Sequence, residues 1–462
     1  MGRSLNRKNT VIIDEKTPLL FLAGPMFFEL FLNTMVNNVD TLMLSRYNEY
    51  AVGAVGNANT VMFMMNILFN VIATATSVVV AQYLGAKRYD KMNMIYTLAI
   101  GVNLVVGLIL SGAFCAANPL LMIFLQVSDE MRQYSMTYIY IVGGCGFLLA
   151  VYGVMLQILR CNGYPKIGMW ITLGINVINI GGNYMFLHGP LAYLDLGVAG
   201  VALSTVAARL VAVIAVFIFF FAKGIGKISF SYLKPFPGRL LGKMIRIGLP
   251  TAGENLTYNL YQTTLLSFVN GMGNDAVNAR VYCNTLIAFA MIFSNACAMS
   301  TQIITGHLVG AGKSEEAYKR VFKTLRTSMP ITIGLASVNA VLCRYTLQLF
   351  TENPNIIALG QMIMIVDIFV EAGRCLNMTF VSSLKAAGAY VFPLIMGILC
   401  NWGLGLVTGY VVGVVLGVGV AGIFAGTATD ECIRGLIVMY YWYKKKWVGK
   451  AVVDKKEAID ID

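Results

Sequence analysis

The chain has 462 residues, of which 58% are hydrophobic and only 12% are charged. Soluble globular domains have roughly 45 to 50% apolar and about 25% charged residues, so this composition excludes a water-soluble domain. The formal net charge is +12. We attribute this charge to membrane topology and to contact with anionic lipid head groups, and we expect no nucleic acid partner.

Apolar segments long enough to cross a bilayer recur along the chain. A helix needs about 20 apolar residues to cross roughly 30 Å of hydrocarbon, and each segment is continuously apolar, whereas the strands of a membrane barrel alternate. We therefore predict an all-α polytopic membrane protein with twelve transmembrane helices. The predicted spans are 18–44, 51–83, 94–118, 132–158, 167–188, 197–222, 243–270, 276–308, 325–350, 356–384, 390–414 and 417–443.

Basic residues cluster at alternate ends of these spans, which predicts the orientation. The opposite loops contain little beyond Arg46, Arg132 and Arg280. By the positive-inside rule, the basic side is cytoplasmic, so we expect a multi-pass protein of the cell membrane with both termini in the cytoplasm. The basic side comprises the N-terminal tail, Lys87 to Lys91, Arg160 with Lys166, Lys223 to Arg246, Lys313 to Arg326, Lys385, and Lys444 to Lys450.

Sequence signatures of enzymes and cofactor sites are missing from the chain. There is no Walker, HExxH or GxSxG arrangement, and the nine cysteines lie almost entirely in apolar spans without metal-ligand spacing. We therefore expect that the protein is not an enzyme and that it uses no cofactor.

An internal repeat divides the chain into two halves. With an offset of 225 residues, Pro25 matches Pro250, Glu29 matches Glu254 and Leu159 matches Leu384; with an offset of 222, Thr205 matches Thr427. Each half has six spans that start on the same side, so the axis that relates the halves lies along the membrane normal. The predicted parts are a cytoplasmic tail (1–16), an N-lobe (17–222), a cytoplasmic connector (223–241), a C-lobe (242–443) and a second cytoplasmic tail (444–462).

Six short motifs in this order resemble the multidrug and toxic compound extrusion (MATE) family. The resemblance covers nearly the whole chain and implies twelve helices in two pseudo-symmetric six-helix lobes. It also implies efflux of small molecules coupled to protons or sodium, in either the DinF-like or the NorM-like branch. The motifs are Gly24-Pro25 with Asn38-Val-Asp40, Gln82-Tyr-Leu-Gly-Ala86, Leu159-Arg-Cys-Asn-Gly-Tyr-Pro165, Gly197-Val-Ala-Gly-Val-Ala202, Gly248-Leu-Pro-Thr-Ala-Gly-Glu254 and Glu371-Ala-Gly-Arg-Cys-Leu-Asn377.

In the N-lobe, the resemblance implies an ion-coupling site formed by Asp40, Asn179, Asn183 and Thr205. Asp40 also ends a polar stripe on one face of the first span, which consists of Glu29, Asn33, Asn37 and Asp40. Asn179 and Asn183 share one helix face because they are four residues apart. Such oxygen atoms suit either a sodium ion or a carboxyl group that exchanges its proton, and the residue types do not decide between them. Alternatively, the amides only pack helices together.

In the C-lobe, Asp367, Glu371 and Arg374 share one face of the tenth span because they are spaced by four and three residues. Arg374 is permanently charged and should neutralise one of these acids. We expect Asp367, Glu371 and Glu254 to take part in binding an ion or the substrate. The alternative is that buried ion pairs hold the lobe together.

These observations favour a secondary antiporter that exports organic cations, drugs or other amphipathic compounds in exchange for protons or sodium by alternating access. We expect it to work as a monomer in contact with membrane lipids. The alternative is a lipid-linked oligosaccharide flippase, whose central cavity would carry several cationic residues, whereas the central positions here are mostly acids and amides. A channel or membrane-embedded sensor would need no coupling carboxylate.

Overall fold

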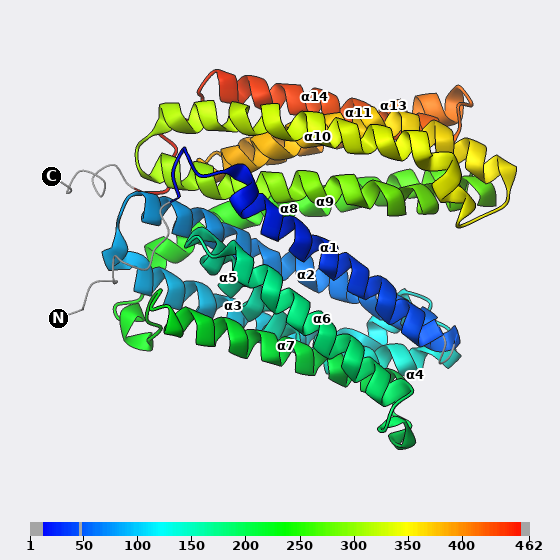
Figure 1. Cartoon of the computed structure of the whole chain (residues 1–462), viewed down its shortest axis with the longest axis horizontal. Helices are drawn as coiled ribbons and strands as arrows, with labels where there is room; N and C mark the ends of the chain where they lie inside the picture. Colours follow the sequence, from blue (N-terminus) through cyan, green and yellow to red (C-terminus); the bar gives the residue numbers. More distant parts are fainter. Residues whose placement is uncertain (1–12, 46–48, 454–462) are drawn as a thin grey trace. The chain divides into compact units, whose positions relative to one another are not determined.

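The computed structural model of the protein describes residues 13–45 and 49–453 (Figure 1). Within these ranges the chain is mainly helical and contains no strand. The α-helices are α1 (Leu19–Ser45), α2 (Glu49–Gly85), α3 (Met92–Phe124), α4 (Asp129–Tyr138), α5 (Gly146–Cys161), α6 (Pro165–Leu187), α7 (Gly197–Ala222), α8 (Gly238–Asn270), α9 (Asn274–Gly310), α10 (Ser314–Gln348), α11 (Pro354–Ala386), α12 (Val391–Ile398), α13 (Leu406–Tyr410) and α14 (Val420–Tyr443).

Two of the membrane spans consist of more than one helical segment. The π-helix η3 (Ile139–Gly143) joins α4 to α5 in a span that bends by 45°, and the π-helices η6 (Leu399–Gly405) and η7 (Val411–Val415) lie with α12 and α13 in one apolar stretch. Over the described residues, the α-helices therefore make twelve spans, in agreement with the sequence prediction.

Hydropathy alone identifies only part of this set. Among the described residues, seven helices are long and apolar enough to cross a membrane, and the bent pair of α4 and α5 brings the number to eight. The other four spans are α6, α8, α10 and α14. Polar or charged side chains, such as Asn179 in α6 and Asp430 in α14, lower their mean hydropathy.

The described chain divides into two compact units. The first unit contains Phe28–Gly248, and the second contains Ile13–Phe27 together with the chain from Leu249 onward. Each unit has its own apolar core. Met65, Phe69 and Tyr138 belong to the first core, whereas Tyr261, Leu265 and Cys283 belong to the second.

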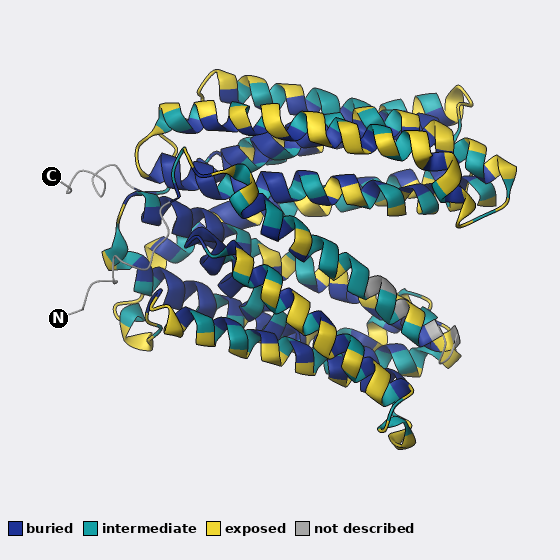
Figure 2. Ribbon diagram, viewed as in Figure 1, coloured by how far each residue is buried: buried dark blue, intermediate teal, exposed yellow. Residues whose placement is uncertain are grey.

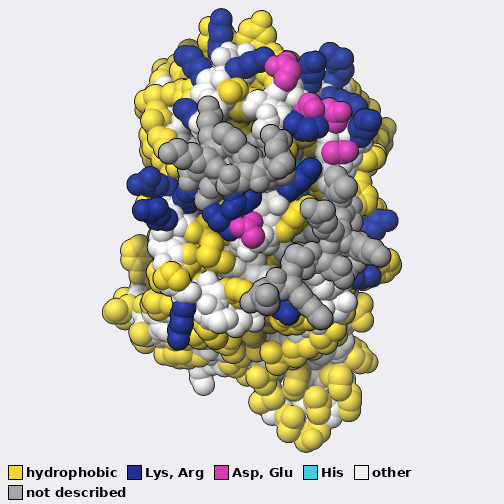
Figure 3. Space-filling model, turned by 90° about the vertical axis from the view of Figure 1, so that its left-hand side faces the viewer, with side chains coloured by type: hydrophobic (Ala, Val, Ile, Leu, Met, Phe, Trp, Pro, Cys, Tyr) yellow, Lys and Arg dark blue, Asp and Glu magenta, His cyan; other side chains and the backbone are white. Residues whose placement is uncertain are grey.

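In each unit, basic segments that are far apart in the sequence come together at one end of the helices. In the first unit, the backbone N–H of Lys227 in the connector donates to Asn93 Oδ1 at the start of α3 (2.8 Å). In the second unit, Lys445 beyond α14 pairs with Glu315 at the start of α10. Figure 3 shows a face of the molecule on which Lys and Arg side chains gather.

The outer faces of the helices are apolar as well as exposed. Figure 2 shows exposed residues along many helices. Exposed helical residues include Ile109, Trp170 and Val341. Large contiguous apolar surfaces are rare on soluble monomers. Exposed apolar surfaces along the helices therefore fit a protein whose helices cross a bilayer.

Glycines bring two spans of the second unit into backbone contact. Gly405, Gly409 and Gly413 recur every four residues, and they face Gly422 and Gly426 of α14. A Cβ atom at Gly426 would lie 2.6 Å from the Cα of Gly409. Small residues at this spacing let membrane helices approach closely, so that they associate through van der Waals contact.

We predict that Gly426→Val lowers the stability of the second unit. The added side chain must push α14 away from the glycine stripe, and overpacking of this kind costs typically about 1–3 kcal/mol. Thermal unfolding of the purified protein in detergent, followed by size-exclusion chromatography, measures the effect. Gly403→Val is the matched control, since a Cβ at Gly403 has nothing within 4 Å; equal midpoints for the two variants would contradict the prediction.

Candidate functional site

The four residues predicted for the N-lobe site lie together in the first unit and are linked by hydrogen bonds. Asn183 Nδ2 donates to Asp40 Oδ1 at 2.7 Å and lies 3.4 Å from Asn179 Oδ1. Asn179 Nδ2 donates in turn to Thr205 Oγ1 at 3.1 Å. The chain of contacts therefore runs from α1 through α6 to α7.

The helical spacing of α6 explains why both amides point into this site. Asn179 and Asn183 are one turn apart on the buried face of the helix, and Ser204 of α7 donates to the backbone oxygen of Asn179 at 2.9 Å, which holds the two helices together. Asn183 is fully buried (0% exposed), yet its Oδ1 atom has no hydrogen-bond partner. A buried carbonyl oxygen without a donor, next to a carboxylate, fits the binding of a sodium ion or a proton.

Glu29 and Asn33, two further residues of the predicted stripe on α1, do not extend this site. The side chain of Asn37 lies outside the described residues, and Asn33 is exposed. Glu29 is instead 3% exposed and forms an ion pair with Arg160 at the end of α5, with Oε1 and Nη2 2.6 Å apart. Glu29 is therefore neutralised within the first unit.

The second unit contains an equivalent ion pair. Glu254 of α8 lies 2.8 Å from the ammonium group of Lys385 near the end of α11. Subtracting 225 from 254 and 385 gives 29 and 160, so both members of the pair follow the internal repeat. From the sequence, Arg160 and Lys385 were predicted only as part of the basic side of the chain, although the register of the repeat also indicates the two pairs.

A larger network of alternating charges joins α11 to α14. Arg374 pairs with Glu371 and lies 3.9 Å from Glu431. Arg434 contacts Glu431 at 3.2 Å and Asp430 at 3.0 Å. Arg434 was not among the residues predicted for the site. Its position, three residues after Glu431 and four after Asp430 in an apolar span, is the signal that could have identified it.

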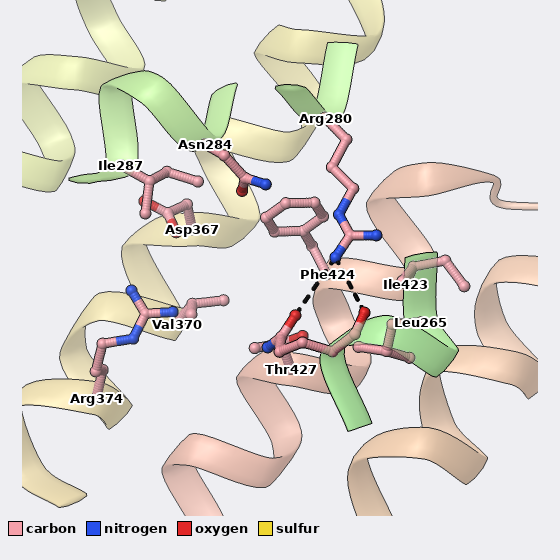
Figure 4. A pocket seen from close by; sticks show the side chains of 11 residues that line it. Leu265, Arg280, Asn284, Ile287, Asp367, Val370, Arg374, Ile423, Phe424 and Thr427 are labelled. Atoms are coloured by element: carbon pink, nitrogen blue, oxygen red, sulfur yellow. Dashed lines mark hydrogen bonds between the residues drawn. The ribbon is translucent and has the colours of Figure 1, made fainter. Parts of the chain in front are cut away.

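Asp367 differs from the other acids of this region because both of its carboxylate oxygens lack a hydrogen-bond partner while its residue is only 1% exposed. It lines a cavity of about 50 Å³, shown in Figure 4, in which Arg280 donates to the backbone and side-chain oxygens of Gln262 at 3.4 Å. A volume of this size holds a few water molecules or a small ion. The other polar residues that line the cavity are Asn284, Arg374 and Thr427.

We predict that Arg374→Met destabilises the protein, because it leaves Glu371 buried without its partner. The loss of one member of a buried pair costs about 3–5 kcal/mol, whereas replacing both members by neutral groups is often neutral. The double variant Glu371→Gln/Arg374→Met should therefore recover most of the stability. The yield of monodisperse protein and its unfolding midpoint measure both effects, and a single variant as stable as the wild type would show that the pair is not structural.

Comparison with known proteins places the whole chain among membrane transporters. The model of the MatE family matches residues 25–185 and again residues 250–411, which reproduces the internal repeat. The chain is 34% identical over 440 residues to the uncharacterized transporter YisQ of Bacillus subtilis, covering 95% of this chain and 96% of the relative. It is 23% identical to a probable multidrug resistance protein NorM of Thermotoga maritima, covering 96% and 95%.

A solved structure has the same fold. A MOP superfamily transporter from Pyrococcus furiosus superimposes with a TM-score of 0.86 at 18% sequence identity, covering 94% of this chain and 96% of the other. This likeness extends over both halves, so the twelve spans follow the known two-lobe architecture.

Proposed function

Because the chain belongs to the multidrug and toxic compound extrusion (MATE) family of membrane transporters, we propose that it exports organic cations, drugs or other amphipathic compounds in exchange for protons or sodium. The observation that supports this proposal is the group of Asp40, Asn179, Asn183 and Thr205, in which a carboxylate lies beside a buried amide oxygen without a donor. The relatives described above are an uncharacterized transporter and a probable multidrug resistance protein, and they give no support to the alternative of a lipid-linked oligosaccharide flippase.

The proposed coupling depends on the two states of Asp40. The charged carboxylate accepts one hydrogen bond from Asn183 Nδ2 and offers its remaining lone pairs to a proton or a sodium ion. Asp40, Asn183, Asn179 and Thr205 would hold such an ion through their side-chain oxygens, and a half-turn of the Asn183 amide would make its Oδ1 available. Binding neutralises the site, and neutral and charged forms of a buried site favour different conformations because buried charge is expensive.

The size of the driving force limits what one coupling ion can do. One pH unit supplies about 1.4 kcal/mol, which corresponds to about a tenfold concentration ratio. Exchange of one proton for one monovalent cation moves no net charge, so the membrane potential adds nothing. Each further proton also gains about 2.3 kcal/mol per 100 mV of membrane potential. A second acidic group that carries a proton would therefore raise the attainable concentration ratio of the cargo steeply.

Of the three acids predicted for the C-lobe, we propose Asp367 as the one that binds a second ion or the cationic cargo. Glu371 is paired with Arg374, and Glu254 is paired with Lys385. Asp367 lines a cavity and neither of its carboxylate oxygens has a hydrogen-bond partner. Glu254 and Glu371 would then hold the lobe together and contribute to the electrostatic field around Asp367.

We also propose that the protein works as a monomer.

Transport by purified protein in liposomes tests the function and identifies the coupling ion. With ethidium as a cationic probe, proton and sodium gradients are imposed separately. We expect either the proton gradient or the sodium gradient to drive ethidium against its own concentration gradient. Collapse of the driving ion gradient should then stop ethidium transport. Movement only down its gradient under both conditions would indicate a channel and contradict the proposal.

We predict that Asp40→Asn abolishes uphill transport in the same liposomes while ethidium binding remains, because an amide cannot gain or lose the coupling charge. Asn179→Ala should weaken coupling less, since it removes a single ligand or hydrogen bond. Asp129→Asn, which changes an exposed acid at the start of α4, is the control. If Asp40→Asn concentrates ethidium at the wild-type rate, the coupling group lies elsewhere and Asp367 is the next candidate.

We propose further that both termini and the connector 223–241 lie in the cytoplasm, as the basic residues suggest. In a cysteine-free background, a single cysteine at Lys234 should react with a membrane-impermeant maleimide only in inside-out vesicles. A cysteine at Tyr193, which is 79% exposed in the loop before α7, should react from outside intact cells. The reverse pattern would invert the orientation.

A further inference from the structure

The first unit has an apolar groove on its surface, separate from the polar site. It lies between α6 and α7, which run side by side (Figure 1), and its volume is about 550 Å³. Its lining combines large apolar side chains with small residues. The groove is lined by residues that include Ile167, Trp170, Gly174, Ala215, Phe219 and Ala222.

The groove covers about half of the membrane thickness. Its lining residues run from position 167 to 178 on α6 and from 211 to 222 on α7. Eleven helical steps of 1.5 Å give a length of about 17 Å, while one leaflet of a bilayer contributes about 15 Å of hydrocarbon. The groove therefore matches one acyl chain in one leaflet.

Positive charge lies at one end of the groove. Lys166 is the second residue of α6 and Lys223 follows the last residue of α7, and both are exposed. The ammonium group of Lys223 is 5.9 Å from the centre of the Phe219 ring, which itself lines the groove. Tyr164 packs edge-on against the same ring at 5.4 Å, and Trp170 is 60% exposed. Aromatic and basic side chains of this kind are typical of the head-group level of a membrane.

From this arrangement, we propose that the groove between α6 and α7 binds an anionic phospholipid, with one acyl chain along Gly174 and the phosphate beside Lys166 and Lys223. The helix ends that carry these lysines place the lipid in the leaflet on the basic side of the protein. That leaflet is the cytoplasmic one in the orientation proposed above, but the site itself does not depend on the orientation or on the transported compound.

The lipid would contact the two helices that carry the predicted ion ligands. Ile178 lines the groove, and the next residue is Asn179, whose side chain donates to Thr205 of α7 on the other face. An acyl chain in the groove would fill the space that the side chains of α6 and α7 leave open between the two helices. It would therefore stabilise the relative position of the two ligand-bearing helices.

The acyl-chain part of the proposal can be tested by filling the groove. A Cβ atom at Gly174 has nothing within 4 Å, so Gly174→Leu extends into the groove without a clash inside the protein. Gly181→Leu is the matched control, because Gly181 is equally open, lies two turns further along α6 and does not line the groove. Ala215→Leu fills the same space from α7.

The measurement is retention of dioleoyl phosphatidylglycerol and dioleoyl phosphatidylcholine by the purified full-length protein, by native mass spectrometry. We expect the wild type and Gly181→Leu to retain more phosphatidylglycerol than phosphatidylcholine. Gly174→Leu and Ala215→Leu should reduce both lipids to background. Replacing Lys166 and Lys223 by Gln should lower only phosphatidylglycerol, by about fivefold for each lysine.

Two results would overturn the proposal, and neither depends on transport. One is equal retention of the two lipids by the wild type, which would remove the role of the lysines. The other is unchanged phosphatidylglycerol retention in both groove-filling variants, provided that they elute as monodisperse protein.

Discussion

The cost of placing charge in hydrocarbon is the constraint on which the rest of this structure depends. An ionised side chain at the centre of a membrane helix costs about 2.5–3.5 kcal/mol on insertion scales, so it needs a partner or a function. Most acids of the described spans have a basic partner: Glu29, Glu254, Glu371, Asp430 and Glu431. Within the same described residues, no ion pair involves Asp40 or Asp367, which makes these two carboxylates the best candidates for exchanging an ion.

The internal repeat distinguishes the acids that form ion pairs from the acids that have no basic partner. The pair of Glu29 and Arg160 recurs as Glu254 and Lys385, at equivalent positions in the second unit. The unpaired acids do not recur, because with the same offset of 225 residues Asp40 corresponds to Leu265 and Asp367 corresponds to Val142. Duplication has therefore kept one ion pair in each half, while the polar sites have diverged.

The sequence predicted the helices, and it predicted the shared buried face of Asn179 and Asn183, because both depend on local spacing. Continuous apolar segments indicate spans, and an interval of four residues places Asn179 and Asn183 on one face. The partners of Glu29 and Glu254 were not predicted, since each lies 131 residues away in the chain and only tertiary packing brings the groups together. The sequence also did not predict that Asp367 lacks a basic partner. This depends on tertiary packing, in which Arg374 pairs with Glu371 and Glu431 instead of Asp367.

A proline precedes the paired glutamate by four residues in both α1 and α8. The boundary between the two units falls inside α1 between Phe27 and Phe28, and inside α8 between Gly248 and Leu249, close to Pro25 and Pro250. Proline removes one backbone hydrogen bond, so a helix resists bending least at that point. The paired glutamate follows four residues later in each helix and fixes the segment beyond the proline to its own unit. Each boundary helix is therefore weakest where it passes from one unit to the other and is anchored one turn later.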